Sequence, residues 1–123
     1  MKRLPVLVAA LGAALGLAAC GGGDDSKGGG GKIAIRLTDK GCMPARLTVP
    51  AGWTTFAITN QGTTKATEFE VLKGSRVLAE KENVTEGIDA EVSLDLAPGR
   101  YSTFCGGGTP KGVLVATGKA RRD

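Results

Sequence analysis

The residues best suited to chemistry in this sequence are two cysteines and two glutamates: Cys42, Glu68, Glu70 and Cys105. Glu68 and Glu70 are two positions apart, so in a strand both side chains project from one face. Two carboxylates on one face repel each other unless a cation, a lysine or bulk water lies between them. Thiolate and carboxylate ligands together suit a borderline or hard transition metal. The four side chains therefore form a candidate metal site.

The same residues have simpler explanations, which stay open on the sequence alone. Two thiols in an exported domain usually oxidise, and a Cys42–Cys105 disulfide would stabilise the fold by about 4 kcal/mol in the chain-entropy model. Glu68 and Glu70 would then be the solvated face of a strand. A third reading, a pair that cycles between thiol and disulfide, is disfavoured because no C-x-x-C motif is present.

The chain contains no histidine, which removes whole classes of site. Imidazole-based acid–base catalysis is excluded, and so is the blue-copper site built from two His, a Cys and an axial Met. We predict a binding or delivery module without catalytic turnover, and a redox or ferroxidase-assisting role stays open. The net charge is only +4, and the basic residues are scattered without interleaved aromatics, so nucleic-acid binding is not expected.

The N-terminus has the pattern of a bacterial export signal. Lys2 and Arg3 precede an apolar run that ends in small residues, and this run is short for a membrane span. Leu17-Ala18-Ala19-Cys20 resembles the lipobox of bacterial lipoproteins, in which the cysteine is acylated and becomes the first mature residue. We predict a lipoprotein signal peptide over residues 1–19, with Cys20 as the lipid anchor. The protein would then be periplasmic or otherwise extracytoplasmic, anchored to a membrane of the bacterial cell envelope.

Residues 20–31 would form the lipidated cysteine and a glycine-rich flexible tether, because Gly21 to Gly31 contains no apolar residue. From residue 32 the hydrophobic period is two, as in Ile33, Ile35 and Leu37. Seven or eight such short runs are separated by turn signals, which predicts an antiparallel sandwich or barrel over residues 32–118. Residues 119–123 form a basic C-terminal tail.

The predicted strands also place the two thiols. Cys105 ends an alternating run and precedes the loop Gly106–Gly108, while Cys42 lies in a loop between the first two strands. If these loops share one end of the sandwich, the thiols can meet. The core is expected to be mainly aliphatic, with the aromatic side chains of the domain added to it: Trp53, Phe56, Phe69, Tyr101 and Phe104.

Several segments together resemble a known family. The stretches 39–44 and 47–52 resemble the opening of a cupredoxin-like domain, and Glu68 to Gly74 resembles the Glu-aromatic-Glu strand of the N-terminal cupredoxin domain of EfeO-type iron-uptake proteins. The match continues through 80–83, 96–101, Cys105-Gly106 and 110–112. The resemblance implies a Greek-key cupredoxin-like sandwich of seven to eight strands.

The family resemblance also implies a function. It suggests copper or iron as the bound metal, with Cys42, Glu68, Glu70 and Cys105 as candidate ligands, and a role in the oxidation or handover of ferrous iron. Partners would be the membrane, through the lipid anchor, and an iron permease or another periplasmic iron-uptake protein. The alternative is a disulfide-stapled β-sandwich that serves as a protein-interaction module without metal.

Overall fold

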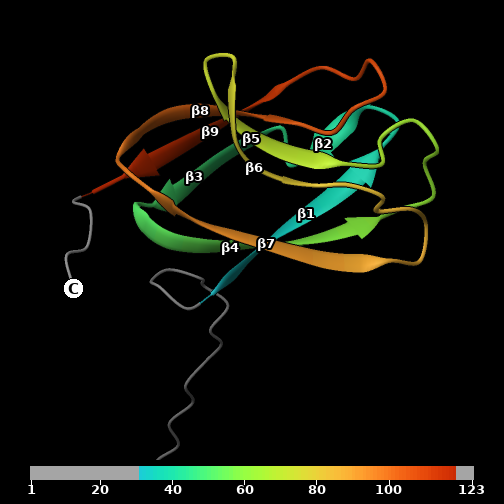
Figure 1. Cartoon of the computed structure of the whole chain (residues 1–123), viewed down its shortest axis with the longest axis horizontal. Helices are drawn as coiled ribbons and strands as arrows, with labels where there is room; N and C mark the ends of the chain where they lie inside the picture. The colour runs from blue at the N-terminus through green and yellow to red at the C-terminus, as the bar shows by residue number, and fades with distance from the viewer. Residues whose placement is uncertain (1–30, 119–123) are drawn as a thin grey trace, which may run out of the picture.

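The computed structural model describes residues 31–118, and every regular element in that range is a β-strand. The strands are β1 (Lys32–Thr38), β2 (Gly41–Met43), β3 (Arg46–Pro50), β4 (Gly52–Asn60), β5 (Phe69–Lys73), β6 (Arg76–Lys81), β7 (Asp89–Leu96), β8 (Gly99–Phe104) and β9 (Gly112–Thr117). They form two sheets that pack face to face (Figure 1). One sheet has the order β2-β1-β4-β7 and the other β3-β9-β8-β5-β6. The predicted all-β sandwich is confirmed.

The strand count and the pairing differ in detail from the sequence-based expectation. There are nine strands rather than seven or eight, because β2 spans only three residues and is too short to show an alternating pattern. Two pairs, β1 with β4 and β3 with β9, are parallel rather than antiparallel. In both pairs the chain forms at least one strand of the other sheet before it reaches the partner strand. Parallel partners of this kind cannot be joined by a tight hairpin.

The predicted signal peptide (1–19), nearly all of the predicted tether (20–31) and the basic tail (119–123) lie outside the described residues. Within 31–118 there is no helix of the length and hydropathy that a bilayer crossing would need.

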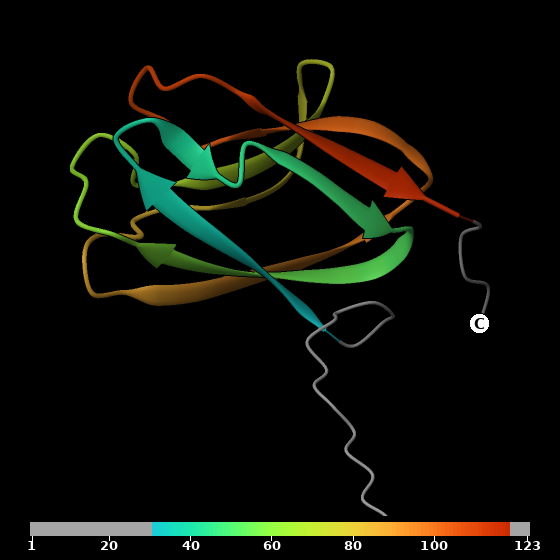
Figure 2. The same ribbon diagram turned by 180° about the vertical axis from the view of Figure 1, so that it is seen from behind.

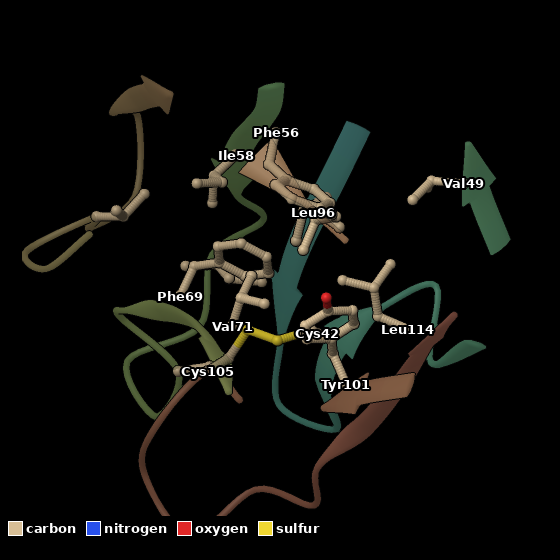
Figure 3. Close-up of a cluster of buried hydrophobic side chains, with 14 of the residues drawn as sticks. Cys42, Val49, Phe56, Ile58, Phe69, Val71, Leu96, Tyr101, Cys105 and Leu114 are labelled. Carbon is tan, nitrogen blue, oxygen red and sulfur yellow. A yellow bond between two sulfur atoms is a disulfide. The ribbon is translucent and has the colours of Figure 1, made fainter. Parts of the chain in front are cut away.

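The core lies between the sheets and is built from alternate residues of both. Phe56 of β4 and Phe69 of β5 are fully buried, with ring centroids 5.2 Å apart and planes tilted by 49°. Aliphatic residues from both sheets surround the two rings (Figure 3). Burial of each such side chain contributes about 2 kcal/mol, so this layer holds the sheets together.

Two aromatic residues expected in the core are elsewhere. Trp53 is 67 % exposed, because β4 alternates and places it on the outer face beside Asp95. Phe104 is half-buried on the outer face of the other sheet, since its neighbours Thr103 and Cys105 are the ones that point inward. The prediction for Trp53 and Phe104 was therefore wrong. The position of each residue in its alternating strand, and not the hydrophobicity of its ring, decides which face of the sheet the side chain takes.

One end of the sandwich gathers the loops that carry the candidate site. The segments 61–68, 82–88 and 105–111 meet there beside the β1–β2 turn (Figure 2). Asn60 connects the loops from the end of β4. Its Nδ2 donates to the carbonyl oxygens of Thr63 (3.1 Å), Ala66 (3.4 Å) and Val84 (2.9 Å). A buried, fully used amide of this kind fixes the loops relative to the sheets.

Candidate functional site

Cys42 and Cys105 are joined by a disulfide in the structure, although 63 positions separate them in sequence. Cys42 lies on β2, opposite Leu37 of β1, and Cys105 follows the last residue of β8. Their Cα atoms are 5.6 Å apart, inside the range that a disulfide requires. The bond therefore ties the four-stranded sheet to the five-stranded sheet at the loop-bearing end (Figure 3).

The sulfur atoms point into the core. Cys42 is 3 % exposed and Cys105 is fully buried, and both belong to the main hydrophobic cluster. A metal-binding cysteine acts as a thiolate, and a sulfur bonded to another sulfur has no thiolate to offer. In this oxidised form neither cysteine can serve as a metal ligand.

The backbone of Glu68 lies directly beside the backbone of Cys105. Its N–H donates to the carbonyl oxygen of Cys105 over 3.4 Å. The side chain crosses Gly106, where an added Cβ would lie only 2.9 Å from the Glu68 Cγ atom. Gly106 also has φ +86°, a left-handed conformation that favours glycine. The first glycine of the loop therefore makes room for the Glu68 carboxylate.

Glu70 points away from the core, because Phe69 and Val71 on either side of it are fully buried. Its cross-strand partners are Phe104 on β8 and Glu80 on β6. Partial burial raises the pKa of Glu70 above its ordinary value. The negative charges of Glu68, Glu80 and Glu82 raise that pKa further, and Lys111 offsets part of the rise. A cation close to Glu70 would act in the opposite direction and favour its charged form.

The structure brings the four predicted site residues to one end of the sandwich but not to one point. The sulfurs face the core, and the Glu70 carboxylate faces solvent on the other side of β5. Across residues 31–118, no three Cys, Asp or Glu side chains are placed to hold a metal ion together. A site that shares thiolates and carboxylates is therefore not assembled while the disulfide is intact.

Two further carboxylates belong to the same corner, and the sequence-based site did not include them. Glu80 and Glu82 have the same spacing of two as Glu68 and Glu70, and both act on the pKa of Glu70. The shared spacing was a signal that could have found them. What the sequence lacked was the register that sets Glu80 opposite Glu70.

Gly107 fixes the position of this corner relative to the loop 61–68. A Cβ at Gly107 would overlap the backbone carbonyl of Lys65, so only a glycine allows the two chains to pass so closely. Its φ of +65° is also left-handed. The glycine-rich loop after Cys105 therefore packs against the segment that leads into Glu68.

A family model described as a cupredoxin-like domain matches residues 7–116. The "Iron uptake system component EfeO" of Escherichia coli (strain K12) is 42 % identical over 93 residues, which cover 75 % of this chain and 24 % of that protein. The protein of the same name from Shigella flexneri matches with the same figures. The chain thus spans about a quarter of the length of these relatives, and the family resemblance in the sequence is confirmed.

Solved structures agree on the fold. The reduced auracyanin of Roseiflexus castenholzii superimposes with a TM-score of 0.60 at 20 % identity, covering 71 % of this chain and 97 % of that chain. Auracyanin A of Chloroflexus aurantiacus, a "blue" copper protein, gives 0.62 at 20 % identity, covering 70 % and 98 %. An azurin of Methylomonas sp. strain J gives 0.55 at 15 % identity, covering 74 % and 98 %. These likenesses confirm the cupredoxin-like fold predicted from the sequence.

Proposed function

The chain belongs to the cupredoxin-like domain family, and from this premise we propose that it is a lipid-anchored, extracytoplasmic component of bacterial iron uptake. Iron would be its cargo, bound or passed on at the acidic corner formed by Glu68, Glu70, Glu80 and Glu82. The likeness to iron-uptake components over 75 % of the chain supports a role in iron uptake. The observation that carries the metal is the cross-strand pairing of Glu70 with Glu80, which sets two carboxylates opposite each other on the outer face of the sheet.

The proposed metal contact differs from the ligand set expected from the sequence. Cys42 and Cys105 are buried and bonded to each other, so a resident copper ion on thiolates does not fit the oxidised domain. Carboxylates suit Fe(III) or Cu(II), whereas Cu(I) prefers sulfur. The domain in this form would therefore contact iron through Glu68 and Glu70, with water or a partner protein supplying the remaining ligands.

Metal analysis of the exported, oxidised protein tests this proposal. The protein is dialysed against Fe(II), Fe(III)-citrate or Cu(II), and retained metal is measured by mass spectrometry. We expect Glu68→Gln/Glu70→Gln to weaken iron binding by about tenfold or more, which corresponds to about 1.4 kcal/mol. Asp95→Asn, on the outer face of the other sheet, is the matched carboxylate control. Cys42→Ser/Cys105→Ser should leave iron binding unchanged. Equal binding by the wild type and the Glu68/Glu70 variant would overturn the proposal.

The lipid anchor is tested separately. The mature protein should begin at Cys20, carry the added mass of its acyl chains and fractionate with membranes. Cys20→Ser should lose that mass and no longer be held on the membrane by lipid. Equal lipid mass and membrane retention in both proteins would show that Cys20 is not the anchor.

A second candidate function is a stapled interaction module that binds no metal and docks on an iron permease or another iron-uptake protein. The buried Cys42–Cys105 bond is the observation that favours it. Free-thiol titration of the unfolded, unreduced protein separates a permanent staple from a reactive pair. A permanent staple leaves no reactive thiol from these two cysteines. Two reactive thiols would count against the staple and return the sulfurs to the list of possible ligands.

A further inference from the structure

The end of the sandwich opposite the loop-bearing end gathers both ends of the described chain (Figure 1). β1 begins there, because Lys32 pairs with a residue near the start of the parallel strand β4. β9 finishes there, because Thr117 pairs with Pro50 of β3, next to the turn into β4. We call this the terminal end. From it the chain leads back to Cys20, the predicted lipid anchor, in one direction and into the basic residues 119–123 in the other.

Two uncharged turns form the tip of the terminal end. Pro50-Ala51-Gly52 leads into β4, and Ala97-Pro98-Gly99 leads into β8. The turns lie side by side because Gly52 pairs with the residue before Ala97. Both prolines are exposed, although exposed turns usually carry polar side chains. Trp53 follows the first turn and is 67 % exposed, and its apolar ring with a polar N–H suits the boundary between lipid and water.

The charged side chains behind this tip have a positive balance. There are four cations and two carboxylates: Lys32, Lys73, Arg76 and Arg100, and Glu91 and Asp95. Lys32 and Glu91 pair with each other over 2.6 Å. Lys73 extends to this end, where its Nζ donates to the Arg100 carbonyl oxygen over 2.9 Å. Residues 119–123 add three cations and one carboxylate. Basic side chains behind an apolar tip complement the phosphates of anionic lipids.

We propose that the terminal end docks on a bilayer surface that contains anionic lipid, with the Trp53 ring at the level of the headgroups. The inference rests on the membrane-anchored location proposed above and is independent of metal binding. Trp53 flanks the tip on the four-stranded sheet and Arg100 flanks it on the five-stranded sheet, so a flat surface laid across the tip meets both. A tether raises the concentration of the domain at the membrane, so a small contact is sufficient for docking.

Docking of this kind would orient the acidic corner. β4 runs from Gly52 at the tip to Asn60 at the loop-bearing end, and its nine residues span about 30 Å. The acidic corner lies at that far end, so it would face away from the bilayer and stay open to the aqueous compartment. Iron would then reach the carboxylates from solution and not along the lipid surface.

Fluorescence tests the docking directly, because Trp53 is the single tryptophan of the chain. The full-length protein is reconstituted with vesicles of phosphatidylglycerol and brominated phosphatidylcholine in equal parts, with a chelator present. Bromine on the acyl chains quenches a tryptophan that touches the lipid, so the Trp53 emission should move to shorter wavelength and be quenched. The signal follows the ring itself, so a failure of the lipid-anchor or metal proposal leaves this test intact.

A displaced reporter separates docking from simple tethering. The protein with Trp53→Phe and Ile88→Trp keeps the same tether but carries its indole in the loop before β7, at the loop-bearing end, where Ile88 is 45 % exposed. Its emission should not be quenched. Equal quenching of the two proteins, or no quenching of Trp53, would overturn the proposal.

Two arginine variants test the contribution of charge. Arg100→Gln should lower the ratio of docked to free domains about fivefold, which corresponds to about 1 kcal/mol for one basic side chain near an anionic surface. Arg46→Gln is the matched control, because Arg46 is also exposed but lies at the loop-bearing end of β3. Replacing phosphatidylglycerol by phosphatidylcholine should weaken the quenching as well. Equal effects of the two variants, or equal quenching in both kinds of vesicle, would also overturn the docking.

Discussion

Glu70 on β5 and Glu80 on β6 are direct cross-strand partners, so two carboxylates face each other on the outer side of the five-stranded sheet. The sheet places them there because Phe69 and Val71 take the inward positions of β5. The arrangement is unfavourable on its own, and its consequences for pH and stability can be measured.

The first prediction concerns pH. The pKa of Glu70 in the folded protein is raised by partial burial and then by Glu68, Glu80 and Glu82, so the folded state holds this proton more tightly than the unfolded state does. The contribution of Glu70 to the free energy of unfolding therefore falls as pH rises. The fall begins near the pKa of a glutamate in the unfolded chain, about 4.3, and ends above the higher pKa of Glu70 in the folded protein. Removing the charge of Glu80 should relieve part of that loss. We expect Glu80→Gln to stabilise the protein by about 0.5 kcal/mol at pH 7 and by nothing at pH 3.

Urea unfolding at the two pH values measures the difference. Asp95→Asn is the control for removal of a surface carboxylate. A stabilisation by Glu80→Gln that persists at pH 3 would show that charge repulsion is not its source.

The second prediction concerns the disulfide. The bond closes a loop of 63 positions between the two sheets, which corresponds to about 4 kcal/mol in the chain-entropy model. Cys42→Ala/Cys105→Ala should therefore unfold at a much lower urea concentration than the oxidised wild type. Reduced wild type, which keeps both sulfur atoms, separates the cross-link from the loss of buried volume. If oxidised and reduced wild type were equally stable, the bond would not hold the sheets together.

The third prediction concerns the glycine loop after Cys105. Gly107 and Gly108 both have left-handed backbone, with φ of +65° and +75°, but only a Cβ at Gly107 would meet another part of the chain, the Lys65 carbonyl. Gly107→Ala should therefore be less stable than Gly108→Ala by about 1–3 kcal/mol, because it adds a steric clash to the same backbone strain. Thermal unfolding of the two variants gives the comparison directly. Equal melting temperatures would mean that the loop 61–68 can move aside at no cost.

The fourth prediction concerns Asn60. Besides its three donated hydrogen bonds, its Oδ1 accepts from the backbone N–H groups of Gly62 (2.7 Å) and Thr63 (2.8 Å). Asn60→Ala leaves the buried N–H of Thr63 and the part-buried N–H of Gly62 without this partner and should cost about 2–3 kcal/mol. Thr59→Ala, at a half-buried outward position on the same strand, should cost far less. Hydrogen exchange should show the loss of protection in the loop 61–68 that leads to Glu68. Unchanged exchange there would mean that Asn60 does not organise the loop.

Local pattern was sufficient for much of the fold. Alternation at Phe69, Glu70 and Val71 identifies a strand and tells which side chain faces solvent, since the period of two is a property of the backbone itself. It was not sufficient for Trp53 and Phe104, because the hydrophobic character of an aromatic ring argues for burial while the phase of its strand places it outside. The three-residue strand β2 was missed because three residues are too few to show a period.

The sequence by itself determined that residues 1–123 supply no imidazole, that Cys42 and Cys105 are the two cysteines of the predicted domain, and that Glu68 and Glu70 are two positions apart. Only the tertiary structure decided that the two sulfurs are bonded inside the core while Glu70 faces outward with Glu80 opposite it. The reason is physical: side-chain direction along one strand is local, whereas sheet order and register depend on contacts between segments far apart in the chain. The register sets Glu80 of β6 opposite Glu70 of β5, and in this way two glutamate pairs that are separate in the sequence form one acidic corner.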